Sequence, residues 1–146
     1  MNVGLKTNDE TQSLHFKDIE RFPDGSGYGA TILVRSRGFS VATRFYFEPQ
    51  PLEAFLVGLK MMDRSLKGKA MLKPLWEGHF VEFEMGTLGR VRVRGEIIEY
   101  SHMRQSLHFA FETDQTCLSP FIRDLEKWRE MPAASEDCND TGTKRR

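Results

Sequence analysis

The sequence predicts an α+β domain: an antiparallel sheet of about six to seven strands with two helices packed on one face. The expected order is β-β-β-α-β-β-β-β-α. Apolar and polar residues alternate in successive stretches, which is the period of strands with one buried face. Two other stretches carry apolar residues at helical spacing. Short glycine-containing connections between neighbouring strands favour antiparallel pairing.

The N-terminal part of the chain opens with strand-like and turn-like segments. A strand is expected at residues 13–22, and "VGLK" before it can add a short edge strand. "PDGSGYG" at residues 23–29 has the proline, aspartate and glycines of a turn. Its G-x-G-x-G spacing also fits a phosphate loop, but such a loop opens a helix, and here the strand-like "ATILVRS" follows. We therefore predict a turn.

A hairpin comes next, with strands at residues 29–36 and 39–47 joined by Arg37-Gly38. The period then changes to that of a helix, with Pro51 in its first turn and Gly68 at its C-terminal cap. The apolar stripe of this helix comprises Leu52, Phe55, Leu56, Leu59, Met62 and Leu66. Gly58 lies in mid-helix, where glycine costs about 0.5–1 kcal/mol relative to alanine. This cost predicts close packing against the sheet.

The strand period returns in the second half of the chain. Strands are expected as a meander at residues 69–75, 79–85, 90–100 and 105–113. A final helix at about 117–130 has the apolar stripe Leu118, Phe121, Ile122, Leu125 and Trp128. From residue 132 the chain is small, polar and aperiodic. One domain over residues 1–131 and a disordered tail over 132–146 are therefore predicted.

Composition excludes several classes of protein. Lysine and arginine number 21, and so do aspartate and glutamate, so no bulk field favours nucleic acid or an anionic membrane. Two cysteines cannot form a disulfide framework, and the N-terminus has no signal-peptide pattern. No apolar run approaches the ~18 residues of a membrane span. We expect a cytoplasmic protein without membrane or nucleic-acid partners, with the oligomeric state open and a homodimer one option.

The junction "FETDQTCLSPF" has two interpretations. Cys117 could be a nucleophile with His108 as its base, or the polar residues could cap the final helix. Thr116 and Ser119 are possible caps, and Asp114 adds favourable charge at the positive helix end. His108 belongs to the polar face of its strand, opposite Leu107 and Phe109, and so points away from Cys117. Capping is therefore the favoured interpretation.

No cofactor or metal is predicted. The histidines are scattered along the chain, and the spacings H-E-x-x-H, C-x-x-C and D-x-D do not occur.

The stretch "GRVRVRGE" provides the candidate binding surface. Its arginines alternate with valines, so all three guanidinium groups share one sheet face. The preceding strand places two glutamates on the matching face, where cross-strand pairs contribute about 0.2–1 kcal/mol each. This face is either a solvated charge ladder or a flat recognition surface for another macromolecule. The candidate partner-binding residues are Glu82, Glu84, Arg90, Arg92, Arg94, His108 and Glu112.

The chain resembles the WapI-type immunity proteins, small bacterial proteins that neutralise polymorphic toxins. The resemblance covers roughly residues 28–130 and rests on "PLEAFLVGLKMM", "LKGKAMLKPLWEGHFVEFEMGTLGRVRVRGEI" and "LHFAFETDQTCLSPFIRDLEKW", with TDQT as the most specific string. Cys117 stands where an aromatic residue is expected, which leaves the fold inference intact. The resemblance implies a non-enzymatic inhibitor that binds a cognate toxin domain.

A second class of function remains open. A small-ligand binder or an enzyme could use a pocket between the sheet and the helices, lined by Trp76, Tyr46 or Trp128. A pocket of about 300 Å³ or more with convergent polar groups would favour this alternative.

Overall fold

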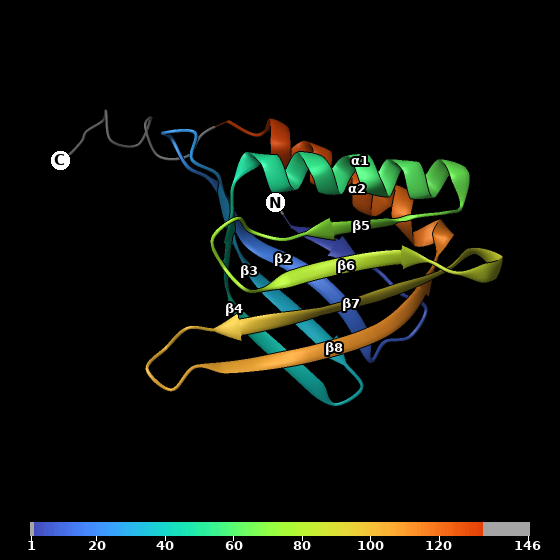
Figure 1. The fold of residues 1–146 in the computed structure, drawn as a ribbon, viewed down its shortest axis with the longest axis horizontal. Helices are drawn as coiled ribbons and strands as arrows, with labels where there is room; N and C mark the ends of the chain where they lie inside the picture. The colour runs from blue at the N-terminus through green and yellow to red at the C-terminus, as the bar shows by residue number, and fades with distance from the viewer. Residues whose placement is uncertain (1, 133–146) are drawn as a thin grey trace.

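The computed structural model describes residues 2–132 (Figure 1), so the predicted tail at 132–146 lies, apart from its first residue, outside the described residues. Within residues 2–132, eight strands form two four-stranded antiparallel sheets. The first sheet, in the order β1-β2-β3-β4, comprises Val3–Leu5, Gln12–Arg21, Tyr28–Ser36 and Phe39–Phe47. The second, in the order β5-β6-β7-β8, comprises Lys69–Leu72, Phe80–Met85, Arg90–Glu99 and Gln105–Asp114.

The α+β class and the antiparallel pairing are confirmed, and "VGLK" does form an edge strand. The division of the strands between two sheets differs from the single sheet expected. Helix α1, Pro49–Ser65, separates β4 from β5 and interrupts the run of hairpins there. In Figure 1 the β5–β8 sheet crosses in front of the β1–β4 sheet. Each sheet thus buries its apolar face against the other rather than against helices alone.

The two helices lie along one edge of this pair of sheets (Figure 1). Helix α1 packs against β5, whereas α2, Leu118–Glu130, packs against β1 and α1. Both helices therefore cover the edge strands of the sheets. A Cβ atom at Gly58 would lie 2.7 Å from the Cβ atom of Ala70 in β5. The close packing predicted from this glycine is confirmed.

Apolar side chains from both sheets and both helices form one core. Trp128 of α2 is completely buried, with ring centroids 5.3 Å from Phe16 and 5.2 Å from Phe47. The predicted helix stripes are buried with one exception, Leu66. Leu66 follows the last turn of α1 with φ at 58° and donates its N–H to the Met62 carbonyl. Leu66, rather than Gly68, therefore ends the helix in the left-handed conformation.

Candidate partner-binding site

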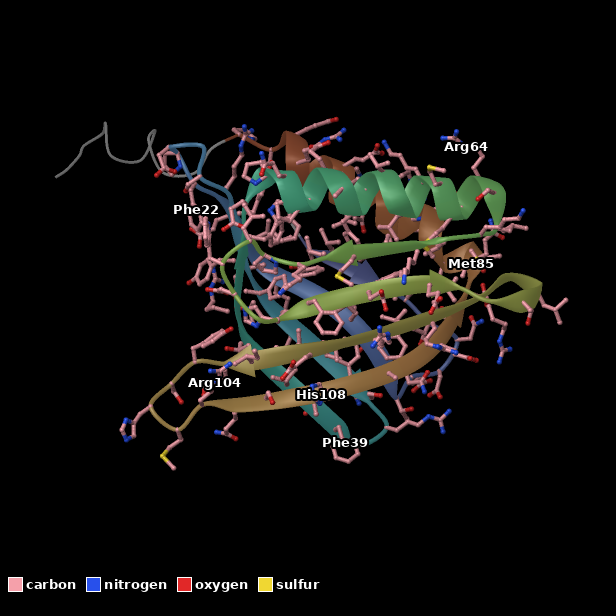
Figure 2. All side chains as sticks on the ribbon, in the orientation of Figure 1. Phe22, Phe39, Arg64, Met85, Arg104 and His108 are labelled. Atoms are coloured by element: carbon pink, nitrogen blue, oxygen red, sulfur yellow. The ribbon has the colours of Figure 1, made fainter. Side chains whose placement is uncertain are left out.

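The outer face of the β5–β8 sheet carries the candidate residues, and it is turned toward the viewer in Figures 1 and 2. The β6–β7 register places Glu82 opposite Arg94 and Glu84 opposite Arg92. The apolar side chains between them, such as Val93, are buried in the core. Strand alternation and a fixed register are thus sufficient to bring the predicted charges together.

Glu82 forms the centre of this face and is only 3% exposed. Its Oε1 accepts a hydrogen bond from Arg94 Nε at 2.7 Å, and its Oε2 lies 4.0 Å from Lys69 Nζ. A buried carboxylate needs such partners because desolvation penalises an unpaired charge. Arg94 also lies over the Phe80 ring, 5.9 Å from its centroid. Glu82 and Arg94 together fix this part of the face.

The remaining candidates form looser, exposed pairs. Arg92 Nη1 lies 3.8 Å from Glu84 Oε1, and Arg90 Nη2 donates to Glu112 Oε1 at 3.0 Å. His108, labelled in Figure 2, has its Nε2 3.3 Å from Oε1 of Glu96. All seven predicted residues therefore pair on this face. Exposed pairs of this kind contribute about 0–1 kcal/mol each.

Sequence reasoning missed two members of the face, Glu96 and Lys69. The alternation that identified Arg90, Arg92 and Arg94 continues for one more step to Glu96. Lys69 alternates with the buried Ala70 in the same way. Extending the two-residue period to the end of each strand would have found both residues.

The TDQT junction leads into the final helix through a short 3₁₀ turn, Gln115–Cys117, and the predicted capping of α2 by Thr116 or Ser119 is wrong: the N-cap of α2 is Cys117, which makes no side-chain cap hydrogen bond. Asp114 caps the 3₁₀ turn instead, because its Oδ1 accepts the Thr116 N–H at 3.0 Å. Its Oδ2 accepts from Asn8 Nδ2 at 2.7 Å, so it also holds the β1–β2 loop. The Thr116 hydroxyl, then the Thr116 N–H, Asn8 and Arg90, keep the pKa of Asp114 below its usual value. Gln115 adds a hydrogen bond to Asp63 of α1, at 2.9 Å.

Cys117 and His108 do not form a nucleophile and base. Cys117 packs partly buried against the core at the start of α2. The His108 side chain is 75% exposed on the outer sheet face and pairs with Glu96. Among residues 2–132, no cluster of three or more histidine, cysteine or acidic side chains is placed to hold a metal. Over the same residues, no helix is both long and apolar enough to cross a membrane.

The aromatic residues suggested for a ligand pocket do not line one cavity. Trp128 fills the core, and Trp76 is 86% exposed in the β5–β6 loop. Tyr46 lines an open cleft of about 320 Å³ with Glu77 and His79, at one end of the inter-sheet boundary. Of the three aromatic residues named for the alternative pocket, Tyr46 thus lines a cleft, but this cleft lies between the two sheets and not between a sheet and the helices.

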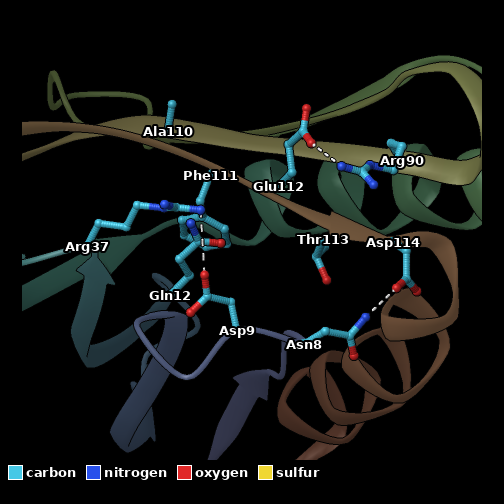
Figure 3. A pocket seen from close by; sticks show the side chains of 10 residues that line it. All are labelled: Asn8, Asp9, Gln12, Arg37, Arg90, Ala110, Phe111, Glu112, Thr113 and Asp114. Atoms are coloured by element: carbon cyan, nitrogen blue, oxygen red, sulfur yellow. Dashed lines mark hydrogen bonds and ion pairs between the residues drawn. The ribbon is translucent and has the colours of Figure 1, made fainter.

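A second cleft, of about 450 Å³, lies at the other end of the boundary (Figure 3). The β1–β2 loop, the β3–β4 turn and the ends of β7 and β8 enclose it. Thr113 lies at its base, 6% exposed, and its hydroxyl has no hydrogen-bond partner among the described residues. The cleft exceeds the 300 Å³ threshold and its lining is polar.

The described fold and face define an α+β protein whose charged groups pair with one another. The chain belongs to the WapI-like immunity protein family, whose model matches residues 5–130. This family is typically non-enzymatic. Searches of curated proteins and of solved structures found no match.

Proposed function

We propose that this protein neutralises a cognate bacterial toxin in the cytoplasm by binding the toxin domain directly, without catalysis or a cofactor. Membership of the WapI-like immunity protein family is the observation that carries this proposal. The outer face of the β5–β8 sheet is the proposed contact surface. Its backbone is hydrogen-bonded through four strands, so binding would need little ordering of the chain.

The charges on this face support selectivity. Carboxylates and guanidinium groups alternate across the strands, and a partner must match both signs to bind. The arginines remain accessible while paired: the Arg90 and Arg92 side chains are 63% and 60% exposed. A toxin domain that binds nucleic acid or nucleotide would carry basic groups. Glu84 and Glu112 would then be direct contacts, with the arginines holding them in place.

The test swaps the two charges of one ion pair between its positions, so that the pair itself is kept. Glu84→Arg combined with Arg92→Glu inverts the pattern that a partner meets but keeps the pair and the net charge. We expect the toxin domain encoded by the adjacent gene to bind at least about tenfold more weakly. Stability should change by less than about 1 kcal/mol, because the pair is exposed. Calorimetric titration and thermal unfolding measure the two effects.

Lys60→Glu with Glu126→Lys is the matched control, because this pair joins α1 to α2 away from the face. The control should bind as the unmodified protein does. Unchanged affinity in the Glu84/Arg92 exchange would remove this face from the proposal and leave the loops and helices as contact surfaces. Absence of toxin binding by the unmodified protein would overturn the proposed function itself. Glu82 is a poor probe because its burial makes charge reversal a test of folding.

A further inference from the structure

The inter-sheet cleft at Thr113 has an unmet hydrogen-bonding requirement. Thr113 is inward-facing on β8, and its hydroxyl is buried with no partner among the described residues. Figure 3 shows this hydroxyl pointing into the space between Asp9 and Asn8. A buried hydroxyl without a partner is unusual in folded proteins, and a group that bonds to it recovers the loss. The cleft measures about 450 Å³. A single water takes about 30 Å³, so one water does not fill the cleft.

The charges around the cleft favour a cation. Three carboxylates line it, those of Asp9, Glu112 and Asp114, against two guanidinium groups, Arg37 and Arg90. Each guanidinium already has a carboxylate: Arg37 lies 3.6 Å from Asp9, and Arg90 lies 3.0 Å from Glu112. Among the described residues, the hydrogen bonds to Asp114 come from neutral donors: Asn8, Thr116 and, at 4.0 Å, the Cys117 thiol. Asp114 is therefore the carboxylate of this lining whose hydrogen bonds come from neutral groups, while Arg90 acts on it only through its charge.

The cleft is also held open by its own contacts. The Asn8–Asp114 hydrogen bond ties the β1–β2 loop to the end of β8, and the Asp9 carboxylate is held by the Thr11 amide at 2.9 Å. The Ser36 hydroxyl donates to the Ala110 carbonyl at 3.3 Å, which joins the first sheet to β8. Prepared acceptors of this kind lower the ordering cost of binding.

We propose that the cleft receives an arginine side chain from the protein partner. The arginine would donate to Asp114 and to the Thr113 hydroxyl. A guanidinium group fits because it offers five N–H donors in a planar fork and loses its hydration more readily than an ammonium group. This inference rests on the proposed function, and it adds an anchor residue next to the charged face. Arg90 and Glu112 belong both to the lining of the cleft and to the charged face of the β5–β8 sheet, so the cleft and the face form one continuous surface.

The first experiment needs no toxin. Argininamide is titrated into the ¹⁵N-labelled full chain, and N-acetylglutamate serves as the anionic comparison. We expect argininamide to shift the amide signals of Asn8, Thr113 and Asp114 in a saturable way and to leave Ser106, on the outer face, unchanged. N-acetylglutamate should shift none of them. Shifts with N-acetylglutamate alone, or no saturable shift with argininamide, would overturn the proposal.

Two variants are expected to change the affinity for argininamide in opposite directions. Thr113→Val removes the hydroxyl at constant shape and should weaken argininamide binding about fivefold to tenfold. Arg37→Ala removes a competing cation from an exposed position and should strengthen it about twofold to fivefold. Thr31→Val, on the other sheet, is the control and should bind normally. Unchanged binding in Thr113→Val would mean that its hydroxyl contacts only water, which contradicts the proposal.

The same variants are then tested against the toxin domain. Thr113→Val should bind it about tenfold more weakly, and Thr31→Val should bind it normally. Normal toxin binding by Thr113→Val, together with weak binding by the Glu84/Arg92 exchange, would retain the proposed function and reject the cleft as an anchor site. If the unmodified protein does not bind the toxin, the proposed function fails. The argininamide titration still decides whether the cleft takes a guanidinium group.

Discussion

The inter-sheet boundary buries a polar side chain at each end, His79 and Thr113, and the hydrogen bonding of the two differs. At one end His79 is completely buried. Its Nδ1 accepts the Ile98 N–H at 3.1 Å, so the ring hydrogen is on Nε2, which donates to Glu77 Oε1 at 2.7 Å. At the other end the Thr113 hydroxyl has no partner among the described residues. A satisfied buried group stabilises the fold, whereas an unsatisfied one costs free energy that a bonding group would recover.

The largest expected effect is at the satisfied end. His79→Ala would leave the Ile98 N–H without its acceptor and open a cavity beside Phe45, whose ring centroid lies 4.8 Å from that of His79. We expect a loss of about 2–4 kcal/mol in the free energy of unfolding, measured by urea denaturation. His108→Ala removes an exposed histidine and should cost less than about 0.5 kcal/mol. Equal losses in the two variants would show that His79 has no structural role.

Asp114→Ala should have the next largest effect, about 1–2 kcal/mol, because it removes a cap and the Asn8 contact together. The pH dependence gives a second measurement. The pKa of Asp114 is held below its usual 3.8, chiefly by the Thr116 hydroxyl. The unfolded chain therefore binds this proton more readily, and the stabilisation present above pH 3.8 is lost as pH falls through the folded pKa.

Between pH 5 and pH 2.5, roughly the range over which a carboxyl of lowered pKa takes up its proton, the unmodified protein should lose more stability than Asp114→Ala. Asp24→Ala is the control, since Asp24 accepts the Ser26 N–H at 2.9 Å within an isolated turn. It should cost less than about 0.5 kcal/mol in the free energy of unfolding at neutral pH. Parallel pH profiles for the unmodified protein and Asp114→Ala would contradict the role given to this carboxylate.

A smaller effect is expected from Tyr100→Phe at the His79 end. The Tyr100 hydroxyl accepts the Gly78 N–H at 2.9 Å in an exposed loop, and its ring contacts His79 edge-on at 5.3 Å. The substitution removes the hydroxyl but keeps the ring. The Gly78 N–H can then bond to water, so the loss should be about 0.5–1 kcal/mol by thermal unfolding. A loss as large as that of His79→Ala would show that the loop, rather than the histidine, holds this end together.

The sequence was sufficient to predict the strands and helices, but it did not predict the two ends of the inter-sheet boundary. Alternation along single strands predicted the faces of β6, β7 and β8, and with them that Glu82 and Glu84 lie beside the arginines of the next strand. Helical spacing predicted the buried stripes of the two helices, which include Phe55 in α1 and Phe121 in α2. Local patterns carry no information about how β4 and β5 relate across α1, so the second sheet was not predicted. The burial of His79 and the cleft at Thr113 both arise where the two sheets part, which is why the sequence did not reveal them.

The smallest expected effect is that of Thr113→Val, and its sign is the informative quantity. Valine matches threonine in shape and favours strands, and it removes a hydroxyl that has no partner within the described part of the chain. The free energy of unfolding should therefore stay the same or rise by up to about 1 kcal/mol. Thr31→Val should instead lose about 0.5–1 kcal/mol, because the Thr31 hydroxyl accepts from Arg44 Nη1 at 3.2 Å. Urea denaturation of the two variants in parallel measures this difference. A loss of more than about 1 kcal/mol in Thr113→Val would mean that an ordered water satisfies the hydroxyl in the free protein, and the contrast between the two ends would then disappear.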